Sequence, residues 1–190
     1  MKELVEQLLF LARGDNDSMH IEMETFDLTE VAAEVLKETG MIDQTHTFSA
    51  RWEGAVPVCA DVGLTKQALR ILVDNSIKYT PAGGHITLSA ALRDGMARLS
   101  VQDEGQGIGA ESLPHIFDRF YRTDESRTRQ TGGTGLGLAI AKWIVERHGG
   151  TCRIENSADA VCFAIKCGVG TVVHTGDFKI DPTPCLLYTS

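Results

Sequence analysis

Apolar residues recur at helical spacing from the first residues of the chain. Leu4, Leu8 and Leu11 follow an i, i+4, i+7 pattern, which predicts an amphipathic helix over residues 1–13. Residues 14–18 (GDNDS) are expected to end this helix. Because no capping residue precedes it, we expect it to be the end of a longer helix.

Two more helices are predicted in the first half of the chain by their starting residues. Asp27 followed by Glu30 is typical of a capping box and predicts a helix to about Lys37. Asp61 is suited to cap a longer helix, which is expected to end before Pro81 because the residue before a proline disfavours helical geometry. The apolar residues of this longer helix lie at helical spacing: Leu64, Ala68, Leu69, Leu72 and Val73.

Alternation of apolar and polar residues predicts the strands. Residues 46–52 (HTFSARW) alternate in this way. Residues 85–92 and 96–103 alternate on either side of residues 93–95 (RDG), which indicates a β-hairpin.

The last part of the chain predicts a helix over residues 138–145, closed by two glycines at 149–150, and a hairpin of residues 151–156 and 161–166. After the first helix, the expected order is helix, two strands, helix, hairpin, loops, helix and hairpin. This order favours an α+β fold, in which helices cover one face of a mixed, mostly antiparallel sheet, over a doubly wound parallel sheet.

Composition excludes some classes of function. The 190 residues, 43% hydrophobic and 23% charged, suffice for one globular domain with its own core. The formal net charge of −8 argues against a general nucleic-acid binder. The five cysteines form no CxxC pair, which favours free thiols in a reducing compartment, and no apolar run is long enough to span a membrane. We therefore expect a cytoplasmic domain that contacts neither nucleic acid nor membrane.

The segment ILVDNSIKYT (residues 71–80) places two polar side chains one helical turn apart. Asn75 offers an oxygen suited to Mg²⁺, and Lys78 offers a point charge suited to phosphate. The alternative is an ordinary solvated helix face. Taken alone, this pair does not decide between the two.

Two further segments can likewise be interpreted either as part of a ligand site or as ordinary structural features. In DEGQGI (residues 103–108), Asp103 is suited to accept a hydrogen bond from an exocyclic amine, while Gly105 and Gly107 let a planar base approach the backbone. The alternative is a surface turn. In IFDRFYR (residues 116–122), three aromatic residues and two arginines form either part of a site or a buried anchor with solvated charges.

The segment TGGTGLGLAI (residues 131–140) concentrates glycines immediately before a predicted helix. Glycines leave backbone N–H groups free to wrap a phosphate, and the helix that follows offers its positive N-terminus. A flexible linker is disfavoured because glycine and leucine alternate and the segment continues directly into the helix.

In this order and spacing, the four segments resemble the N, G1, F and G2 boxes of the catalytic, ATP-binding domain of two-component sensor histidine kinases, in the GHKL superfamily. The resemblance covers about residues 21–167, and residues 1–13 resemble the end of the second helix of the family's dimerisation and phosphoacceptor hairpin. It implies a Bergerat-type two-layer α/β sandwich with ATP, held with Mg²⁺, between the helical layer and a lid.

The resemblance also implies roles for individual residues. Asn75 would bind Mg²⁺, Lys78 would reach the phosphates, and Tyr79 would flank the adenine. Asp103 would accept from the adenine amino group. The residues that would shape the adenine pocket are Gly105, Gly107 and Ile108.

The remaining roles concern the phosphates and the lid. Arg119 and Arg122 are candidates for phosphate contact, and Phe117 and Phe120 would seat the lid. The residues that would wrap the phosphates are Gly133, Thr134, Gly135, Leu136 and Gly137. One departure is Ile71, which stands where many relatives have a second Asn or Glu, so metal binding would rely more on Asn75 and water.

The phosphoacceptor of the family is a histidine in a HELRTPL-like helix, and no histidine of this chain has that context: His20, His46, His85, His115, His148 and His174. We therefore expect the chain to bind ATP without phosphorylating itself. For a full-length parent, the resemblance implies a homodimer, a response regulator as partner, and membrane anchoring through an N-terminal region that this chain lacks.

The C-terminal residues depart from the family pattern. Residues 168–184 resemble a segment of the ribonuclease J family, in which Asp177 would bind metal, but the HxHxDH motif that such a site requires is absent from the sequence. Residues 185–190 (CLLYTS) resemble translated sequencing-adapter sequence. We therefore expect a chimeric tail, with a natural divergent tail as the alternative.

Two other function classes are alternatives to the kinase. A conformational ATPase of the gyrase, mismatch-repair and chaperone type shares the fold, but it uses a glutamate base that is missing beside Asp74 and Asn75. A metal-dependent ribonuclease is suggested by the tail alone.

Overall fold

The structure is a computed structural model that describes residues 2–16, 18–122, 133–157 and 160–168, with side chains for residues 4–16, 18–122 and 133–154. Its elements in chain order are α1 (Lys2–Asp15), β1 (Glu24–Asp27), α2 (Leu28–Ile42), β2 (Thr47–Trp52), β3 (Pro57–Ala60), α3 (Val62–Tyr79), β4 (His85–Arg93), β5 (Met96–Asp103), α4 (Gly137–Arg147), β6 (Thr151–Ser157) and β7 (Ala160–Gly168).

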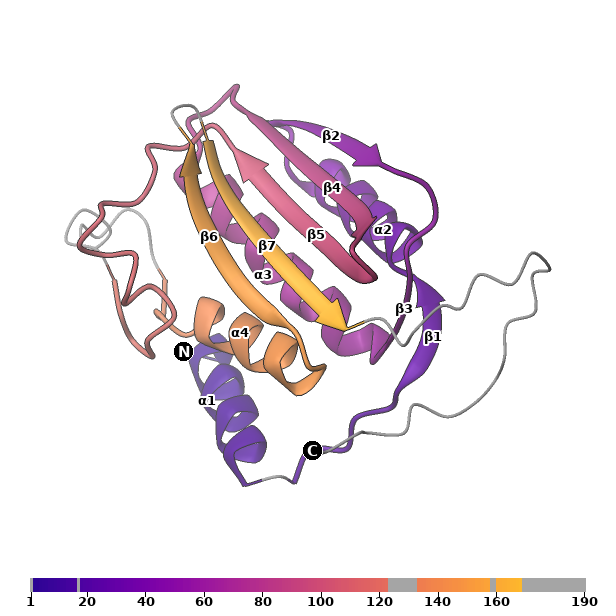
Figure 1. The fold of residues 1–190 in the computed structure, drawn as a ribbon. Coiled ribbons are helices and arrows are strands. Elements are labelled where there is room, and N and C mark those ends of the chain that lie inside the picture. Colours follow the sequence, from indigo (N-terminus) through magenta and orange to yellow (C-terminus); the bar gives the residue numbers. More distant parts are fainter. Residues whose placement is uncertain (1, 17, 123–132, 158–159, 169–190) are drawn as a thin grey trace.

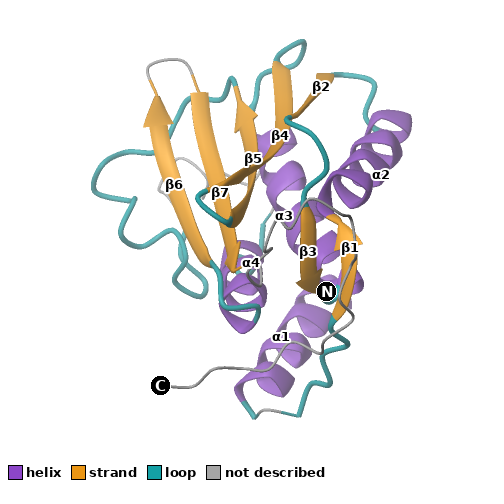
Figure 2. Cartoon of the chain, turned by 45° about the vertical axis from the view of Figure 1, so that its right-hand side comes forward, coloured by secondary structure: helices purple, strands orange, loops and turns teal. Residues whose placement is uncertain are grey.

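A five-stranded sheet forms one of two layers. Its strands lie in the order β2-β4-β5-β7-β6, and every neighbouring pair is antiparallel except β2 with β4. Helices α2, α3 and α4 cover one face of this sheet (Figures 1 and 2), and α1 leans against α4. The predicted α+β sandwich with a mixed, mostly antiparallel sheet is confirmed.

The core fills the space between the two layers. The apolar face predicted for α3 is almost fully buried, with Leu69 and Val73 at 0% exposure. These side chains belong to one cluster with residues from the central strands: Ile86, Leu88, Leu99 and Val101. The apolar side chains that recur every 3.6 residues along the helix therefore pack against those that recur every two residues along the strands, in one core.

Both predicted helix caps are present. Asp61 accepts a hydrogen bond at Oδ1 from the Leu64 N–H (2.9 Å), and Asp27 accepts at Oδ1 from the Thr29 N–H (2.9 Å). Helix α2 continues to Ile42, past the expected end at Lys37. Its last turn ends in Met41 and Ile42, which are 63% and 85% exposed and so lie outside the buried face of the helix.

The hairpin predicted around residues 93–95 is confirmed by the register of β4 and β5. Asp94 and Gly95 both have positive φ values, 52° and 72°, as the tightest hairpin turns require. The hairpin of β6 and β7 is confirmed as well. Strand β1, in contrast, was not expected, and β3 is the second of the two strands in the expected order, for which no position was predicted.

Helix α1 ends at Asp15, within the segment predicted to end it, although it runs through Gly14 and two residues past the expected boundary at residue 13. Tertiary packing overrides the local signal here, because Gly14 lies against the Trp143 ring of α4 and its carbonyl accepts from Arg147 (3.2 Å). Apart from Gly168, the predicted tail, including Asp177, lies outside the described residues. Among the described residues, no helix is long and apolar enough to cross a membrane.

Candidate functional site

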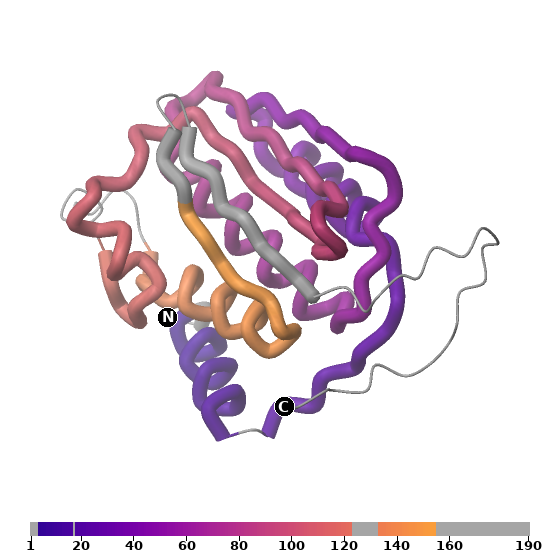
Figure 3. The backbone as a smooth tube through the Cα atoms, viewed as in Figure 1, coloured from indigo at the N-terminus to yellow at the C-terminus, as the bar shows by residue number. Residues whose placement is uncertain are grey.

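A cavity of about 260 Å³ lies where α3, the end of β5, the following loop, the start of α4 and α1 meet. Figure 3 shows this loop and the start of α4 beside the beginning of α1. The predicted site residues that line the cavity come from all four motifs: Asn75, Lys78, Tyr79, Asp103, Gly107, Ile108, Arg122, Gly133, Thr134, Gly135 and Gly137.

Helix α3 supplies one wall of the cavity. Asn75 and Lys78 lie one turn apart and both line the cavity, as their spacing predicted. Ile71 and Asp74 line the same wall. The wall therefore combines an amide, an ammonium and a carboxylate with one apolar side chain.

Asp103, at the end of β5, is the most buried polar residue of the cavity wall, with 3% exposure. Its Oδ2 accepts from the Ser76 hydroxyl (2.8 Å), and its Oδ1 accepts from the Gly105 N–H (2.9 Å). Burial raises the pKa of Asp103, and these two hydrogen bonds offset only part of that effect. The carboxylate is thus held in one position and faces the cavity with its remaining acceptor capacity.

Gly105 permits this arrangement by lacking a side chain. A Cβ atom there would lie 2.7 Å from Asp103 Oδ1 and 3.0 Å from the Tyr79 carbonyl oxygen. Gly105 itself does not line the cavity, so it affects the site through the position of Asp103.

The glycine-rich segment is joined to the loop after β5 by a backbone contact. The Phe120 N–H donates to the Gly135 carbonyl (2.8 Å), and Gly135 has a φ of 71°. A Cβ on Gly135 would lie 2.8 Å from the Phe120 carbonyl carbon, so the close approach requires glycine. Phe120 also has a positive φ, 65°, which is unfavourable for an aromatic residue.

Helix α4 begins at the cavity. Gly137 and Leu138, in its first turn, line the cavity, and the N-cap residue Leu136 makes no side-chain hydrogen bond to the helix start. The first N–H groups of an α-helix have no partner within the helix and carry partial positive charge. Lys78 and Arg122 line the same cavity, which is therefore suited to an anion.

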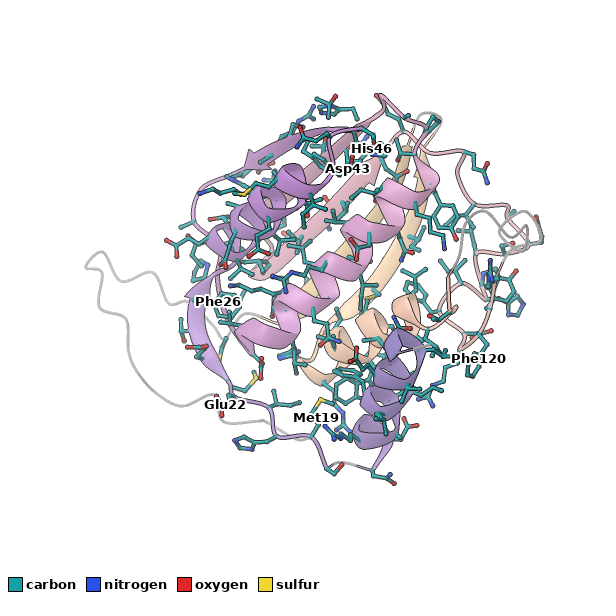
Figure 4. The ribbon with its side chains drawn as sticks, turned by 180° about the vertical axis from the view of Figure 1, so that it is seen from behind. Met19, Glu22, Phe26, Asp43, His46 and Phe120 are labelled. Atoms are coloured by element: carbon teal, nitrogen blue, oxygen red, sulfur yellow. The ribbon has the colours of Figure 1, made fainter. Side chains whose placement is uncertain are left out.

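The structure places some predicted residues away from the cavity. Arg119 forms a two-pronged ion pair with Asp15 of α1 (2.8 and 2.7 Å), on the side of the loop that faces that helix. Phe120 is 59% exposed and lies beside α1 (Figure 4). Leu136 is fully buried in the core, where its side chain anchors the start of α4.

Several cavity residues were not predicted from the sequence: Gln7, Asp74, Gln106, Ile116, Tyr121 and Leu138. Asp74 and Leu138 adjoin motif positions, so neighbourhood along the chain could have suggested them. Nothing in the sequence indicated Gln7, because it lies in a separate helix whose docking is a tertiary property.

The comparisons with known proteins agree with one another. The family model described as "Histidine kinase-, DNA gyrase B-, and HSP90-like ATPase" matches residues 60–182. The sensor histidine kinase YkoH of Bacillus subtilis (strain 168) is 44% identical over 149 residues, which are 78% of this chain and 32% of that protein. The chain spans about a third of the length of the curated relatives it matches first.

Solved structures give the same result. Full-length ShkA in complex with AMPPNP matches with a TM-score of 0.78 and 25% identity, over 89% of this chain and 36% of that one. Histidine kinase ThkA in complex with the response regulator TrrA matches with a TM-score of 0.70 and 27% identity, over 89% and 49%.

Proposed function

The chain belongs to the histidine kinase-, DNA gyrase B- and HSP90-like ATPase family as a catalytic domain of the sensor histidine kinase type, and from this premise we propose that its cavity binds ATP together with Mg²⁺. The observation that carries the proposal is the combination of charged groups that line one cavity. Asp103 lies buried in its wall, and Lys78, Arg122 and an uncapped helix start line the same cavity. An aminopurine joined to phosphates is complementary to these groups, because its amine can donate to Asp103 and its phosphates can contact the cationic groups.

The residues present fit such a ligand. The buried Asp103 carboxylate is placed to accept from an exocyclic amine, and Tyr79, Gly107 and Ile108 would surround the ring. Lys78, Arg122 and the N–H groups at residues 133–137 would hold the phosphates. Arg122 lines the cavity, whereas Arg119 does not and pairs with Asp15, so we assign the phosphate contact to Arg122.

We assign Mg²⁺ to Asn75. Among the described residues, no group of three or more His, Cys, Asp or Glu side chains is placed to hold a metal ion. A Mg²⁺ ion would therefore be held by the Asn75 oxygen, the nucleotide phosphates and water, which is the usual way this ion binds with nucleotides. When bound, it would neutralise phosphate charge.

The proposal is tested by calorimetry of ATP binding to the whole chain with Mg²⁺ and with a chelator. We expect Mg²⁺-dependent binding, and Asn75→Ala should remove most of the dependence on Mg²⁺ without changing the affinity for adenosine. Equal affinity of parent and variant for ATP in Mg²⁺ would contradict the assignment of Asn75. Failure of the parent to bind either ligand would refute the function.

The proposed kinase activity requires an acceptor from outside this chain. His46 and His148 are engaged at both ring nitrogens by hydrogen bonds within the fold, and no other histidine has the acceptor context. With labelled ATP, the chain alone should incorporate no acid-labile phosphate. A separate dimerisation domain with its acceptor histidine should restore transfer, because positioning is a large part of phosphoryl-transfer catalysis. Self-phosphorylation on a histidine would contradict this expectation.

The partners proposed for the parent are a second copy and a response regulator. Val5, Leu8 and Leu9 of α1 are 53%, 40% and 51% exposed and form a second apolar face, suited to the same face of a second copy. The ThkA structure contains a response regulator, which supports that partner for this family. Membrane anchoring of the parent and cytoplasmic placement of this domain remain predictions.

The two alternatives are not favoured. The relatives reported above are sensor kinases, and their similarity extends over most of this chain. A conformational ATPase would need a glutamate base beside Asn75, and residues 71–80 contain no glutamate. The ribonuclease alternative depends on residues outside the described ones.

A further inference from the structure

Helix α1 is docked on α4 by a small, well-packed contact. The rings of Phe10 and Trp143 meet edge to face with centroids 5.3 Å apart, and Leu11 is 3% exposed. At Gly14, a Cβ atom would lie 2.6 Å from Trp143 Cε2, so the helix backbone rests directly on the ring. Figures 1 and 4 show the two helices side by side.

Gln7 shares this docking face and reaches the cavity. Positions 7, 11 and 14 follow helical spacing, which places Gln7 on the same side of α1 as Leu11 and Gly14. Gln7 is the one residue of α1 that lines the cavity among the described residues. Its Oε1 accepts a hydrogen bond from the Thr134 hydroxyl at 2.5 Å.

The Thr134 hydroxyl takes part in a second hydrogen bond. Its oxygen accepts from the Leu136 N–H at 3.2 Å, at the entrance to α4. A hydroxyl group has a single proton, so Thr134 donates either to Gln7 or to another acceptor. Phosphate oxygens are acceptors, and a phosphate at this end of the cavity would therefore compete with Gln7 for the same proton.

We propose that Gln7 is a positioning residue that withholds the Thr134 hydroxyl proton from nucleotide phosphates while α1 is docked on α4. The inference rests on the proposed binding of ATP in this cavity. Docking of α1 and full engagement of the phosphates then oppose each other. By linkage, phosphate binding weakens the docking of α1 by the same factor as docking weakens phosphate binding.

A second contact joins α1 to the loop after β5, and it contributes less to the docking of α1 than the packing on Trp143 does. Asp15 and Arg119 form an ion pair, but each side chain is 46% exposed, and exposed pairs contribute little. The packing of Gly14 on Trp143 therefore sets the docked position, which in turn sets the position of Gln7. The Thr134 hydroxyl can therefore be released in two separate ways. One removes the Gln7 acceptor, and the other displaces helix α1 from Trp143.

The first experiment removes the acceptor. In Gln7→Leu, binding of ATP with Mg²⁺ to the whole chain should tighten about 3–10-fold, the range expected for release of one neutral hydrogen bond. Binding of adenosine, which has no phosphate, should not change. Gln7→Glu keeps an acceptor oxygen for Thr134 and should give no tightening. In a Thr134→Val background, Gln7→Leu should have no effect on ATP affinity.

The second experiment displaces the helix without touching Gln7 or Thr134. Gly14→Ala forces a methyl group against Trp143 and should also tighten ATP binding while leaving adenosine binding unchanged. Unchanged or weaker ATP binding in Gln7→Leu, equal tightening for adenosine, or persistence of the effect without the Thr134 hydroxyl would each overturn the inference. In contrast, a parent chain that binds neither ATP nor adenosine would overturn the proposed function itself.

Discussion

The two ends of the cavity are held in different ways. The Asp103 end, formed by Tyr79, Asp103 and the adjoining loop, is fixed by hydrogen bonds from Ser76 of the core helix α3 and from Gly105 in the loop after β5. The glycine-rich end, residues 133–137, is held by Phe120 of a distant loop and by Gln7 of α1. One end is part of the folded core, whereas the other is assembled from separate segments.

This difference separates two tasks. A rigid end is suited to recognising a flat base through a fixed acceptor, because preorganised groups lose little entropy on binding. An end built from several segments is suited to responding when one of those segments shifts. Variants at the two ends should therefore differ in which part of the nucleotide they affect.

The largest effect is expected at Asp103. Asp103→Asn keeps the shape of the side chain but replaces an acceptor by an amide N–H₂ group toward the ligand. We expect ATP and adenosine affinity to fall alike, by about 10–100-fold, as for a lost hydrogen bond to a charged group. The measurement is calorimetry with both ligands.

Asp94→Asn is the matched control, since Asp94 lies at the β4–β5 turn, where asparagine tolerates the positive φ of 52°. It removes the same charge far from the cavity and should leave both affinities unchanged. If Asp103→Asn bound adenosine like the parent, Asp103 would not recognise the base, and the two ends would not divide the nucleotide as proposed.

The glycine-rich end gives the next largest effect. In Gly135→Ala, the positive φ of 71° and the crowding against Phe120 should displace the segment. We expect ATP affinity to fall by about 5–50-fold, equivalent to 1–2.3 kcal/mol, with no change for adenosine. Gly95→Ala has the same backbone strain, φ 72°, but nothing within 4 Å of the added methyl, so it should lower stability alone. A parallel loss of adenosine affinity in Gly135→Ala would contradict the independence of the two ends.

The sequence predicted the Asp103 end better than the glycine-rich end. The helix with Asn75 and Lys78, the strand ending at Asp103 and the Asp61 cap are local patterns, and the structure contains them as predicted. Arg119 and Gln7 could not be placed in this way. Their partners, Asp15 and Thr134, lie more than a hundred residues away along the chain, and only tertiary packing brings them together.

A smaller effect concerns a histidine that supports the Asp103 end. Both ring nitrogens of His46 face oxygen acceptors, Asp43 Oδ2 (2.7 Å) and the Thr80 carbonyl (3.1 Å), beside the end of α3. Burial alone would lower the pKa of His46, but these two acceptors raise it above its ordinary value. Burial alone would raise the pKa of Asp43, but hydrogen bonds from Thr45 and His46 hold it at about 2.

The signs of these shifts define a pH window. The contribution of charged His46 to stability is complete below its ordinary pKa of 6.5 and is lost as the pH rises through its higher folded-state value. The contribution of Asp43 is complete above its ordinary pKa of 3.8 and is lost as the pH falls through about 2. Both contributions are therefore complete between these two ordinary values.

His46→Gln should lower the Tm by about 2–4 °C at pH 6, equivalent to ~1 kcal/mol, and the difference from the parent should shrink toward pH 9. Thermal melts across this range measure it. His115→Gln is the matched control, because His115 has the same i, i+3 contact with Asp118 but is 57% exposed at the side chain. It should show no such trend. A parent–variant difference for His46 that is constant with pH would mean that the imidazole is not charged in the fold.

The smallest effect is expected for the C-terminal residues. Strand β7 pairs with β5 along its length, ending with Gly168 opposite Met96, so the described pairing of these strands does not need residues 169–190. Deleting residues 169–190 should leave ATP and adenosine affinity unchanged and shift the Tm by no more than about 2 °C. It should also improve solubility, because it removes the apolar runs TVV and CLLY.

The family model, however, matches as far as residue 182, which gives the deletion a definite alternative outcome. If the deletion lowered the Tm substantially or abolished the shift that ATP produces, residues 169–182 would be a native part of the domain, and the chimeric interpretation of the tail would be wrong. If it left both unchanged, the two ends of the cavity would depend only on residues up to 168.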